Sequence, residues 1–182
     1  MEIGIFSMNL KLVAIIMIFL GVVARLFPHA PNAAPITALA LFGAVYLPKK
    51  FAFIPLIALF ISDLFIGFYG ITMIYVYSSF LLVGLIGLWL KEEKSIVNTI
   101  GAALVSSVLF YLITNFGVWA NPQSFYSKDI YGLIESYYFG IPFFRNTLLG
   151  DLGYTALFFG GYEIAQILAK KYLPEKVFKL AF

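Results

Sequence analysis

The sequence predicts an all-α integral membrane protein, built as a bundle of six transmembrane helices. Hydrophobic residues make up 62% of its 182 positions, and only 12% are charged. Soluble domains carry about 25% charged residues, and a chain this short has too little interior to hide so much apolar surface from water. The apolar residues also fall into long runs separated by short polar links, as in membrane-spanning helices. We therefore expect a single transmembrane domain over residues 1–182.

The apolar runs define the predicted elements in chain order. The expected spans cover about residues 9–26, 33–47, 50–67, 72–90, 96–120 and 143–169, with an interfacial helix over about 129–140. Three prolines in Phe27–Pro35 exclude a continuous helix between the first two spans. The apolar part of the second span, Ile36–Leu47, rises only about 18 Å, against a hydrocarbon core of about 30 Å. A re-entrant helix is therefore the alternative to a short second span.

The three middle spans carry the usual marks of membrane helices. Lys49 and Lys50 open the third span, and the polar link KEEKS separates the fourth from the fifth. The fourth span has tyrosines at one end and Trp89 at the other, as membrane interfaces favour. Small residues between Gly101 and Ser107 allow close helix packing in the fifth span.

The last apolar run is unusually polar for a membrane helix. Its polar residues are Arg145, Asn146, Thr147, Asp151 and Glu163. A charge at the middle of a bilayer costs several kcal/mol, so such residues usually face a protein interior or a wet cavity. Just before this run, residues 129–140 show apolar side chains at helical spacing. They predict a separate helix on the membrane face, either a surface cap or a mobile lid.

The basic residues predict that both termini are cytoplasmic. With six spans, nine lysines fall on inner segments, and only Arg25, Lys128 and Arg145 fall on outer segments. An excess of lysine and arginine marks cytoplasmic loops. A cleaved signal peptide is the alternative interpretation of the first apolar run, although one lysine and one glutamate precede it.

Polar residues from separate segments converge in the outer half of this arrangement. Binding pockets combine apolar walls with a few convergent polar groups, so we expect an outward-facing pocket for a small solute. Its candidate residues are Arg25, His29, Asn32, Asp63, Tyr75, Asn115, Trp119, Arg145, Asn146 and Asp151. The alternative is structural: the arginines would reach lipid headgroups, and the buried carboxylates would only fix helix positions.

Helical phase predicts the partners of the polar residues in the last span. Arg145 and Asp151 are six residues apart and face different neighbours, whereas Thr147 and Asp151 share a helix face. Arg145 is therefore expected to pair with Asp63 or with the solute itself.

Several kinds of chemistry are absent from the sequence. No GxxxxGK[ST] loop is present, which excludes ATP hydrolysis by that route. With no cysteine and one histidine, neither thiol catalysis nor a thiolate- or histidine-rich metal site is expected, and no cofactor is predicted. The net charge of +3 reflects loop lysines better than a nucleic-acid surface.

Four segments carry a family resemblance. They read RLFPHAPNAAPITALALFGAVYLPKK, SDLFIGFYG, LITNFGVW and GIPFFRNTLLGDLGYTALFFGG. Over nearly the whole chain they resemble a family of uncharacterised bacterial membrane proteins described as transport proteins. In layout the chain is also similar to the substrate-binding S components of energy-coupling factor (ECF) vitamin transporters. The shared features are six helices, both termini inside, a proline-rich first outer loop and a short second helix.

This resemblance implies a function and a set of partners. The protein would sit among the lipids of the bacterial inner (plasma) membrane and capture a vitamin-like micronutrient from outside. It would then dock on a shared transmembrane coupling subunit driven by two ATPase subunits. S components often carry Ala-x-x-x-Ala on the first helix for docking, whereas here Ala40 and Ala44 have that spacing on the second helix.

Two other classes of function compete with this reading. In an intramembrane enzyme, Asp63 and Asp151 would share a proton for acid–base work. The Gly-x-Gly-Asp motif of intramembrane aspartyl proteases is not met, because Leu148, Leu149 and Gly150 precede Asp151. A channel or a structural membrane subunit is the other class. A channel would carry polar residues along its whole path, whereas the inner half here has mainly Glu163.

Overall fold

The computed structural model describes residues 10–28, 30–49, 53–172 and 174, and within these residues the chain contains helices and no strands. The all-α prediction is confirmed for this part of the chain. The elements are α1 (Leu10–Leu26), α2 (Ile36–Tyr46), α3 (Ile54–Ile66), α4 (Thr72–Glu92), α5 (Ile96–Ala120), α6 (Ile130–Thr155), the π-helical segment η2 (Ala156–Gly160) and α7 (Gly161–Tyr172). The predicted site residue His29 lies outside the described residues.

Two helices are long and apolar enough to cross a membrane. They are α4 and α5, each with a mean hydropathy of 2.0 over its most apolar stretch. In the described part of the chain the other helices do not meet both requirements. Length and composition thus identify two membrane-capable helices, and α2 and most of α3 form shorter apolar helices.

The short helix α2 lies at the centre of the fold. It contacts α3, α4, α5 and α6, and all of its residues except Phe42 and Tyr46 are buried. A helix that is apolar on every side is stable only when other helices surround it, and this explains why 11 residues suffice here. Pro35 immediately precedes the first residue of α2, and Leu47, whose backbone is extended, follows its last residue.

Close packing of α2 against α4 depends on glycine. A Cβ atom placed on Gly87 would lie 2.6 Å from the Cβ of Ala44 and 3.3 Å from the carbonyl oxygen of Ala40. Ala40 and Ala44 are only 1% and 0% exposed. The prediction that these alanines dock a partner protein is therefore wrong, because their small side chains are already used inside the chain, where they let two helices approach.

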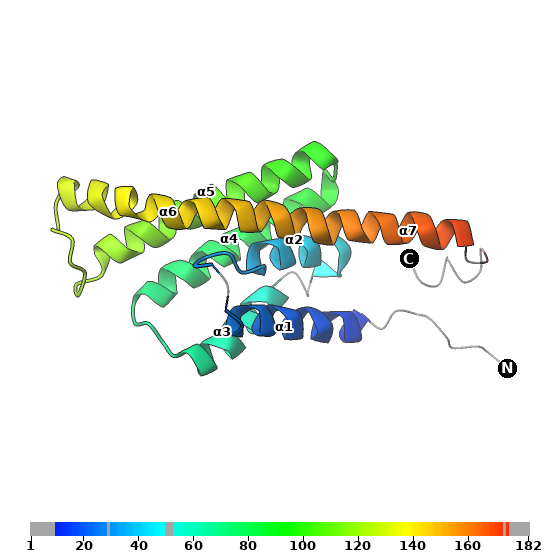
Figure 1. Ribbon diagram of the computed structural model, residues 1–182, viewed down its shortest axis with the longest axis horizontal. Coiled ribbons are helices and arrows are strands. Elements are labelled where there is room, and N and C mark those ends of the chain that lie inside the picture. Colours follow the sequence, from blue (N-terminus) through cyan, green and yellow to red (C-terminus); the bar gives the residue numbers. More distant parts are fainter. Residues whose placement is uncertain (1–9, 29, 50–52, 173, 175–182) are drawn as a thin grey trace.

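The helix that ends the described chain is longer than predicted. We expected a helix over 129–140 separate from a span beginning at residue 143. Instead α6 runs without interruption through Pro142, and η2 and α7 continue it to Tyr172 (Figure 1). The whole segment therefore measures roughly 64 Å at 1.5 Å per residue, about twice a hydrocarbon core. The expected break is wrong.

Contacts with α5 explain why Pro142 does not end α6. Proline removes a backbone hydrogen bond and typically costs about 3 kcal/mol inside a helix. The hydroxyl of Tyr111 donates to the Tyr137 carbonyl oxygen at 2.7 Å, and the hydroxyl of Tyr137 donates to the Leu112 carbonyl oxygen at 2.9 Å. Gly140 packs so closely that an added Cβ would meet the Asn115 amide at 2.3 Å. These contacts hold the residues before the proline in helical register.

The ends of the helices divide the molecule into a lysine end and an opposite end. The start of α1, the α2–α3 and α4–α5 connections and the end of α7 all lie at the same end in Figure 1. We call this the lysine end, after Lys49, Lys91, Lys94, Lys170 and Lys171. The connections α3–α4 and α5–α6 lie at the opposite end (Figure 1).

The first turn of α6 is held by a side-chain cap. The carboxylate of Asp129 accepts hydrogen bonds from the Gly132 amide at 2.9 Å and from the Ser127 hydroxyl at 2.7 Å. The Gly132 bond, together with the Ser127 bond, lowers the pKa of Asp129 below its ordinary value of 3.8. Because the folded pKa is depressed, the stabilisation is present above about pH 4 and is lost as pH falls through the folded pKa.

This cap gives a pH-dependent prediction. Asp129→Ala should speed amide exchange at Gly132 and Leu133 at pH 7, because the first turn loses its acceptor. The difference from the parent should shrink as pH approaches 3, measured by hydrogen–deuterium exchange mass spectrometry. Asp129→Asn is the control, since it keeps an acceptor without a titrating charge. An Asp129→Ala effect of the same size at both pH values would contradict the assignment.

Candidate functional site

An ion pair joins the end of α1 to α3. The Arg25 guanidinium donates to one Asp63 carboxylate oxygen at 2.7 Å and to the Leu59 carbonyl oxygen at 3.1 Å, and it also contacts the Ser62 hydroxyl. The side chain of Asp63 is 0% exposed, and that of Arg25 is 15% exposed. Arg145 was expected to pair with Asp63 or with the solute, but Asp63 pairs with Arg25, and Arg145 is exposed.

Two tyrosines complete the surroundings of Asp63. The Tyr77 hydroxyl donates to its second carboxylate oxygen at 2.9 Å, and the Tyr69 hydroxyl approaches the same oxygen at 3.4 Å. Burial, together with the negative charge of Asp63, raises the pKa of Tyr69 to about 12. Asp63 therefore has a partner on each oxygen and ties together α1, α3, α4 and the α3–α4 connection. We call Arg25, Ser62, Asp63, Tyr69 and Tyr77 the Asp63 network.

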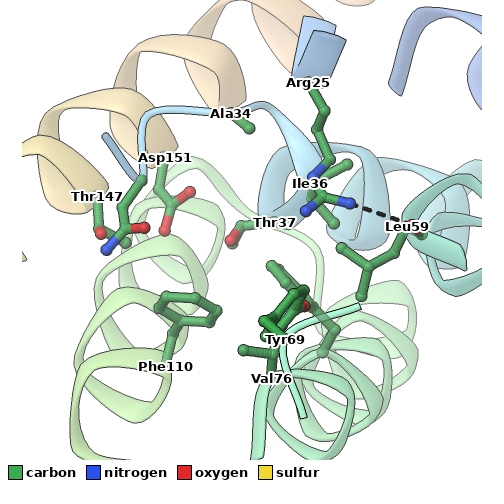
Figure 2. Close-up of a pocket in the computed structure, with 12 residues that line it drawn as sticks. Arg25, Ala34, Ile36, Thr37, Leu59, Tyr69, Val76, Phe110, Thr147 and Asp151 are labelled. Atoms are coloured by element: carbon green, nitrogen blue, oxygen red, sulfur yellow. Dashed lines mark hydrogen bonds between the residues drawn. The ribbon is translucent and has the colours of Figure 1, made fainter. Parts of the chain in front are cut away.

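A cavity lies beside this network, at the N-terminal end of α2. Its volume is about 240 Å³. Figure 2 shows side chains from several elements around it. The lining residues are Arg25, Asn32, Ala34, Ile36, Thr37, Leu59, Tyr69, Val76, Phe80, Phe110, Thr147 and Asp151. Half of these residues are apolar and half carry a polar group, and small-molecule sites likewise combine apolar walls with convergent polar groups.

Asp151 supplies a buried carboxylate to the wall of the cavity. The residue is 1% exposed, and one of its oxygens accepts a hydrogen bond from the Ser107 hydroxyl of α5 at 2.7 Å. Figure 2 shows its side chain on the same side of the cavity as Thr147, with Thr37 between it and Arg25. Among the described residues, no lysine or arginine forms an ion pair with Asp151. A buried carboxylate without a cation is costly and thus uncommon in a purely structural role.

A second cavity lies next to the first. It measures about 350 Å³ and shares Asn32, Val76 and Phe110 with the first cavity. Its wall also contains Asn115 and Gly140, from the packed faces of α5 and α6. Asn32, Asn115 and Asp151 thus line two adjoining cavities, whereas a single pocket was expected.

Five of the described predicted site residues line neither cavity, and one of them, Asp63, lies beside the first cavity in the Asp63 network. The Tyr75 ring packs on Gly117, where an added Cβ would lie 2.3 Å from it. The indole of Trp119 donates to the Ser127 carbonyl oxygen at 2.9 Å. Arg145 is exposed and Asn146 is half-buried. Arg145 and Asn146 line neither cavity because the face of α6 that carries Thr147 and Asp151 is the one turned to the first cavity.

Sequence reasoning missed the aromatic walls of the cavity. Phe80 and Phe110 lie with ring centroids 5.1 Å apart and face the cavity from α4 and α5. Both helices are apolar all round, so periodicity alone cannot mark which residues face inward. Thr37 had a detectable signal, since it lies two residues after Pro35, the end of the proline-rich segment that carries Asn32.

An aromatic cluster fills the fold towards the lysine end of α2. The ring of Phe42 lies 5.5 Å from that of Phe159, and the ring of Tyr46 lies 4.2 Å from that of Tyr162. At its edge, the Tyr46 hydroxyl donates to Glu163 at 3.0 Å, and Glu163 also pairs with Lys94. Burial alone would lower the pKa of Lys94, but its hydrogen bonds to Glu163 and Tyr46 raise it. The rings therefore pack at the end of α2 that lies away from the cavity.

The two acidic residues proposed for an intramembrane enzyme have separate partners. Asp63 is held by Arg25 and the two tyrosines, whereas Asp151 is held by Ser107. A shared proton requires two carboxylates in direct contact, and neither residue has the other as a partner. Within the described residues, no group of three or more His, Asp or Glu side chains gathers as metal ligands.

Comparison with known proteins places the chain in a family. The model of a family of unknown function (DUF6580) matches residues 7–175, so the chain belongs to that family. This agrees with the resemblance to an uncharacterised family. No curated protein and no solved structure matches the chain.

Proposed function

We propose that this member of the DUF6580 family is a membrane-embedded solute-binding protein, the substrate-binding component of a micronutrient uptake transporter. The observation that carries the proposal is the cavity with the buried, cation-free Asp151 in its wall. Residues brought together from α1, α2, α3, α4, α5 and α6 line it. A cavity lined by so many helices, with a buried acid that has no cation partner among the described residues, suits a ligand better than it suits packing.

The proposed topology has six spans and cytoplasmic termini. It is supported by α4 and α5 as membrane-capable helices and by the gathering of lysines at one end of the molecule. In this topology the lysine end is cytoplasmic, and the cavity opens towards the outer face. The short helices α2 and α3 enter the membrane because longer neighbours surround them. The N-terminal part of α6 rises beyond the bilayer on the outer side, which accounts for its excess length.

The aromatic cluster supports a binding protein over an open channel. Phe42, Tyr46, Phe159 and Tyr162 fill the path between the cavity and the cytoplasmic side. A conducting pore would need polar or hydrated surface along that path. Transfer of the solute inward then needs a conformational change driven from outside the chain, and the ATP-driven coupling subunit implied by the ECF resemblance would supply it. With Ala40 and Ala44 buried, the proposal assigns no docking motif.

Filling the cavity tests the proposed function. Ala34 lines the cavity from the segment before α2, so Ala34→Phe should occupy it without disturbing a helix (Figure 2). The parent chain and Arg145→Gln, which changes an exposed residue, should release the same small molecule when the purified protein is denatured. Ala34→Phe should release at least about tenfold less, as expected for a loss of 1.4 kcal/mol or more. Mass spectrometry of the released material measures this.

The controls separate binding from folding. All three proteins should elute as one species in size-exclusion chromatography, and an empty-detergent extract supplies the blank. Equal release from a folded Ala34→Phe protein would place the solute elsewhere. Release of nothing above the blank by the parent would contradict solute capture.

A further inference from the structure

The charges around the cavity do not balance. Arg25 is its one described lining residue with a positive charge, and Arg25 is neutralised by Asp63 at 2.7 Å. Asp151 is the one described lining residue with a negative charge that has no ion pair. With Asp151 ionised, the cavity and the Asp63 network together carry one net negative charge. A buried charge is stable only when it is paired, protonated or strongly hydrogen-bonded.

The hydrogen bonds to Asp151 leave room for another donor. Ser107 donates at 2.7 Å, and Thr37 contributes a further side-chain hydrogen bond. An ionised carboxylate can accept about four hydrogen bonds. Both donors are neutral hydroxyls, so they orient the carboxylate without cancelling its charge. The remaining positions on Asp151 suit a charged donor from a ligand.

The opposite walls of the cavity favour a ring. Phe80 and Phe110 form a tilted pair with centroids 5.1 Å apart, and Tyr69 closes the side near Arg25 (Figure 2). Aromatic faces attract cations within about 6 Å and stack on flat rings. The volume of about 240 Å³ is just below the usual range for drug-sized ligands, so the occupant is small.

We propose that the solute is a small organic cation, a protonated amine or a cationic heterocycle on a compact ring. Its positive group pairs with Asp151, and its ring lies between the aromatic walls. This inference rests on the proposed solute-binding function and adds the chemical class of the solute. An anionic solute would be repelled by ionised Asp151, and a neutral solute would require Asp151 to be protonated, whereas a cation pairs directly with the ionised carboxylate.

Three probes of nearly equal size test the charge preference directly. Benzylamine is protonated at pH 7 and so presents a cation on a ring, benzyl alcohol is its neutral analogue, and benzoate is an anion of similar shape. Binding to the full chain in phosphatidylcholine nanodiscs is measured by isothermal titration calorimetry, with empty nanodiscs as the blank. For the parent, benzylamine should bind about 10- to 100-fold more tightly than either other probe, as a charged hydrogen bond predicts.

Three variants locate the preference. Asp151→Asn keeps the shape of the side chain and removes its charge, so the preference for benzylamine over benzyl alcohol should disappear. Arg145→Gln is the matched control, a charge change on the same helix at an exposed position, and should keep the full preference. Ala34→Phe should reduce the binding of every probe, because it fills the cavity.

Each outcome decides the inference. If benzyl alcohol or benzoate binds the parent as tightly as benzylamine, and Ala34→Phe abolishes that binding, the cation class is overturned while solute binding stands. If the preference survives in a folded Asp151→Asn protein, Asp151 is not the cation partner and the inference also fails. If no probe binds the parent above the blank, both the inference and the assignment of this cavity to a solute are overturned. If Asp151→Asn does not fold, the affinities of the three probes for the parent protein still decide whether the cavity prefers a cation.

Discussion

Replacing Arg25 with methionine should lower the free energy of unfolding by about 3–5 kcal/mol, the usual cost of removing one partner from a buried ion pair. Methionine keeps much of the length and apolar stem of arginine but leaves Asp63 without a positive charge. The side chain of Asp63 is 0% exposed, so water cannot replace the guanidinium. The hydroxyls of Tyr69 and Tyr77 are neutral and compensate only part of the lost interaction. The measurement is equilibrium unfolding in detergent, followed by far-ultraviolet circular dichroism.

Two further variants separate the ion pair from general effects of the substitution. Arg145→Met makes the same chemical change at an exposed position and should alter stability by no more than about 0.5 kcal/mol. Arg25→Met combined with Asp63→Leu removes both charges and should recover part of the loss, because no unpaired buried carboxylate remains. If Arg25→Met is no more destabilising than Arg145→Met, the Asp63 network does not hold α1 against α3.

Gly87→Ala should lower the free energy of unfolding by about 1–3 kcal/mol, the usual cost of overpacking a core. The added methyl group would lie 2.6 Å from the Cβ of Ala44, which belongs to a rigid helix and cannot rotate away. Helix propensity alone would predict the reverse, since alanine favours a helix over glycine by about 1 kcal/mol. The sign of the effect, measured in the same unfolding experiment, therefore reports whether α2 and α4 are in contact.

The matched control for this change is Gly101→Ala on α5. Nothing lies within 4 Å of the position that its Cβ would take, so the change should be neutral or stabilising by up to about 1 kcal/mol. The double variant Gly87→Ala with Ala44→Gly moves the methyl group across the interface and should recover at least about 1 kcal/mol of coupling energy. Stabilisation by Gly87→Ala would show that α2 and α4 lie further apart than described.

Sequence alone determined the helices and the residues with unusual chemistry. High apolar content in long runs predicted membrane helices, and the limits of α5 coincide with the predicted run 96–120. Asp63 and Asp151 stood out because a carboxylate inside an apolar helix is costly wherever that helix packs. Arg25 and Asn32 were also predicted as site residues, because they are polar and lie in the outer half of the expected bundle. Both line the cavity.

Only the tertiary structure decided which polar residues meet. Arg25 and Asp63 are 38 residues apart, and their pairing depends on how α1 and α3 rotate against each other, which no local pattern encodes. The orientation of α6 about its own axis likewise turned Arg145 to the surface and Asp151 inward. Separate helices were expected over 129–140 and from residue 143, yet one helix runs through Pro142, and tyrosine hydrogen bonds between α5 and α6 hold it there.

The cavity itself is the feature that sequence could least foresee. Its aromatic walls come from α4 and α5, where apolar residues cover every face and no period marks the inner one. For Ala40 and Ala44 too, the sequence did not tell an internal contact from a partner contact. Small residues at four-residue spacing suit any close helix contact, inside the chain or with a partner. Residue type fixed the chemistry available to this protein, and the rotation and close approach of the helices decided which groups that chemistry brings together.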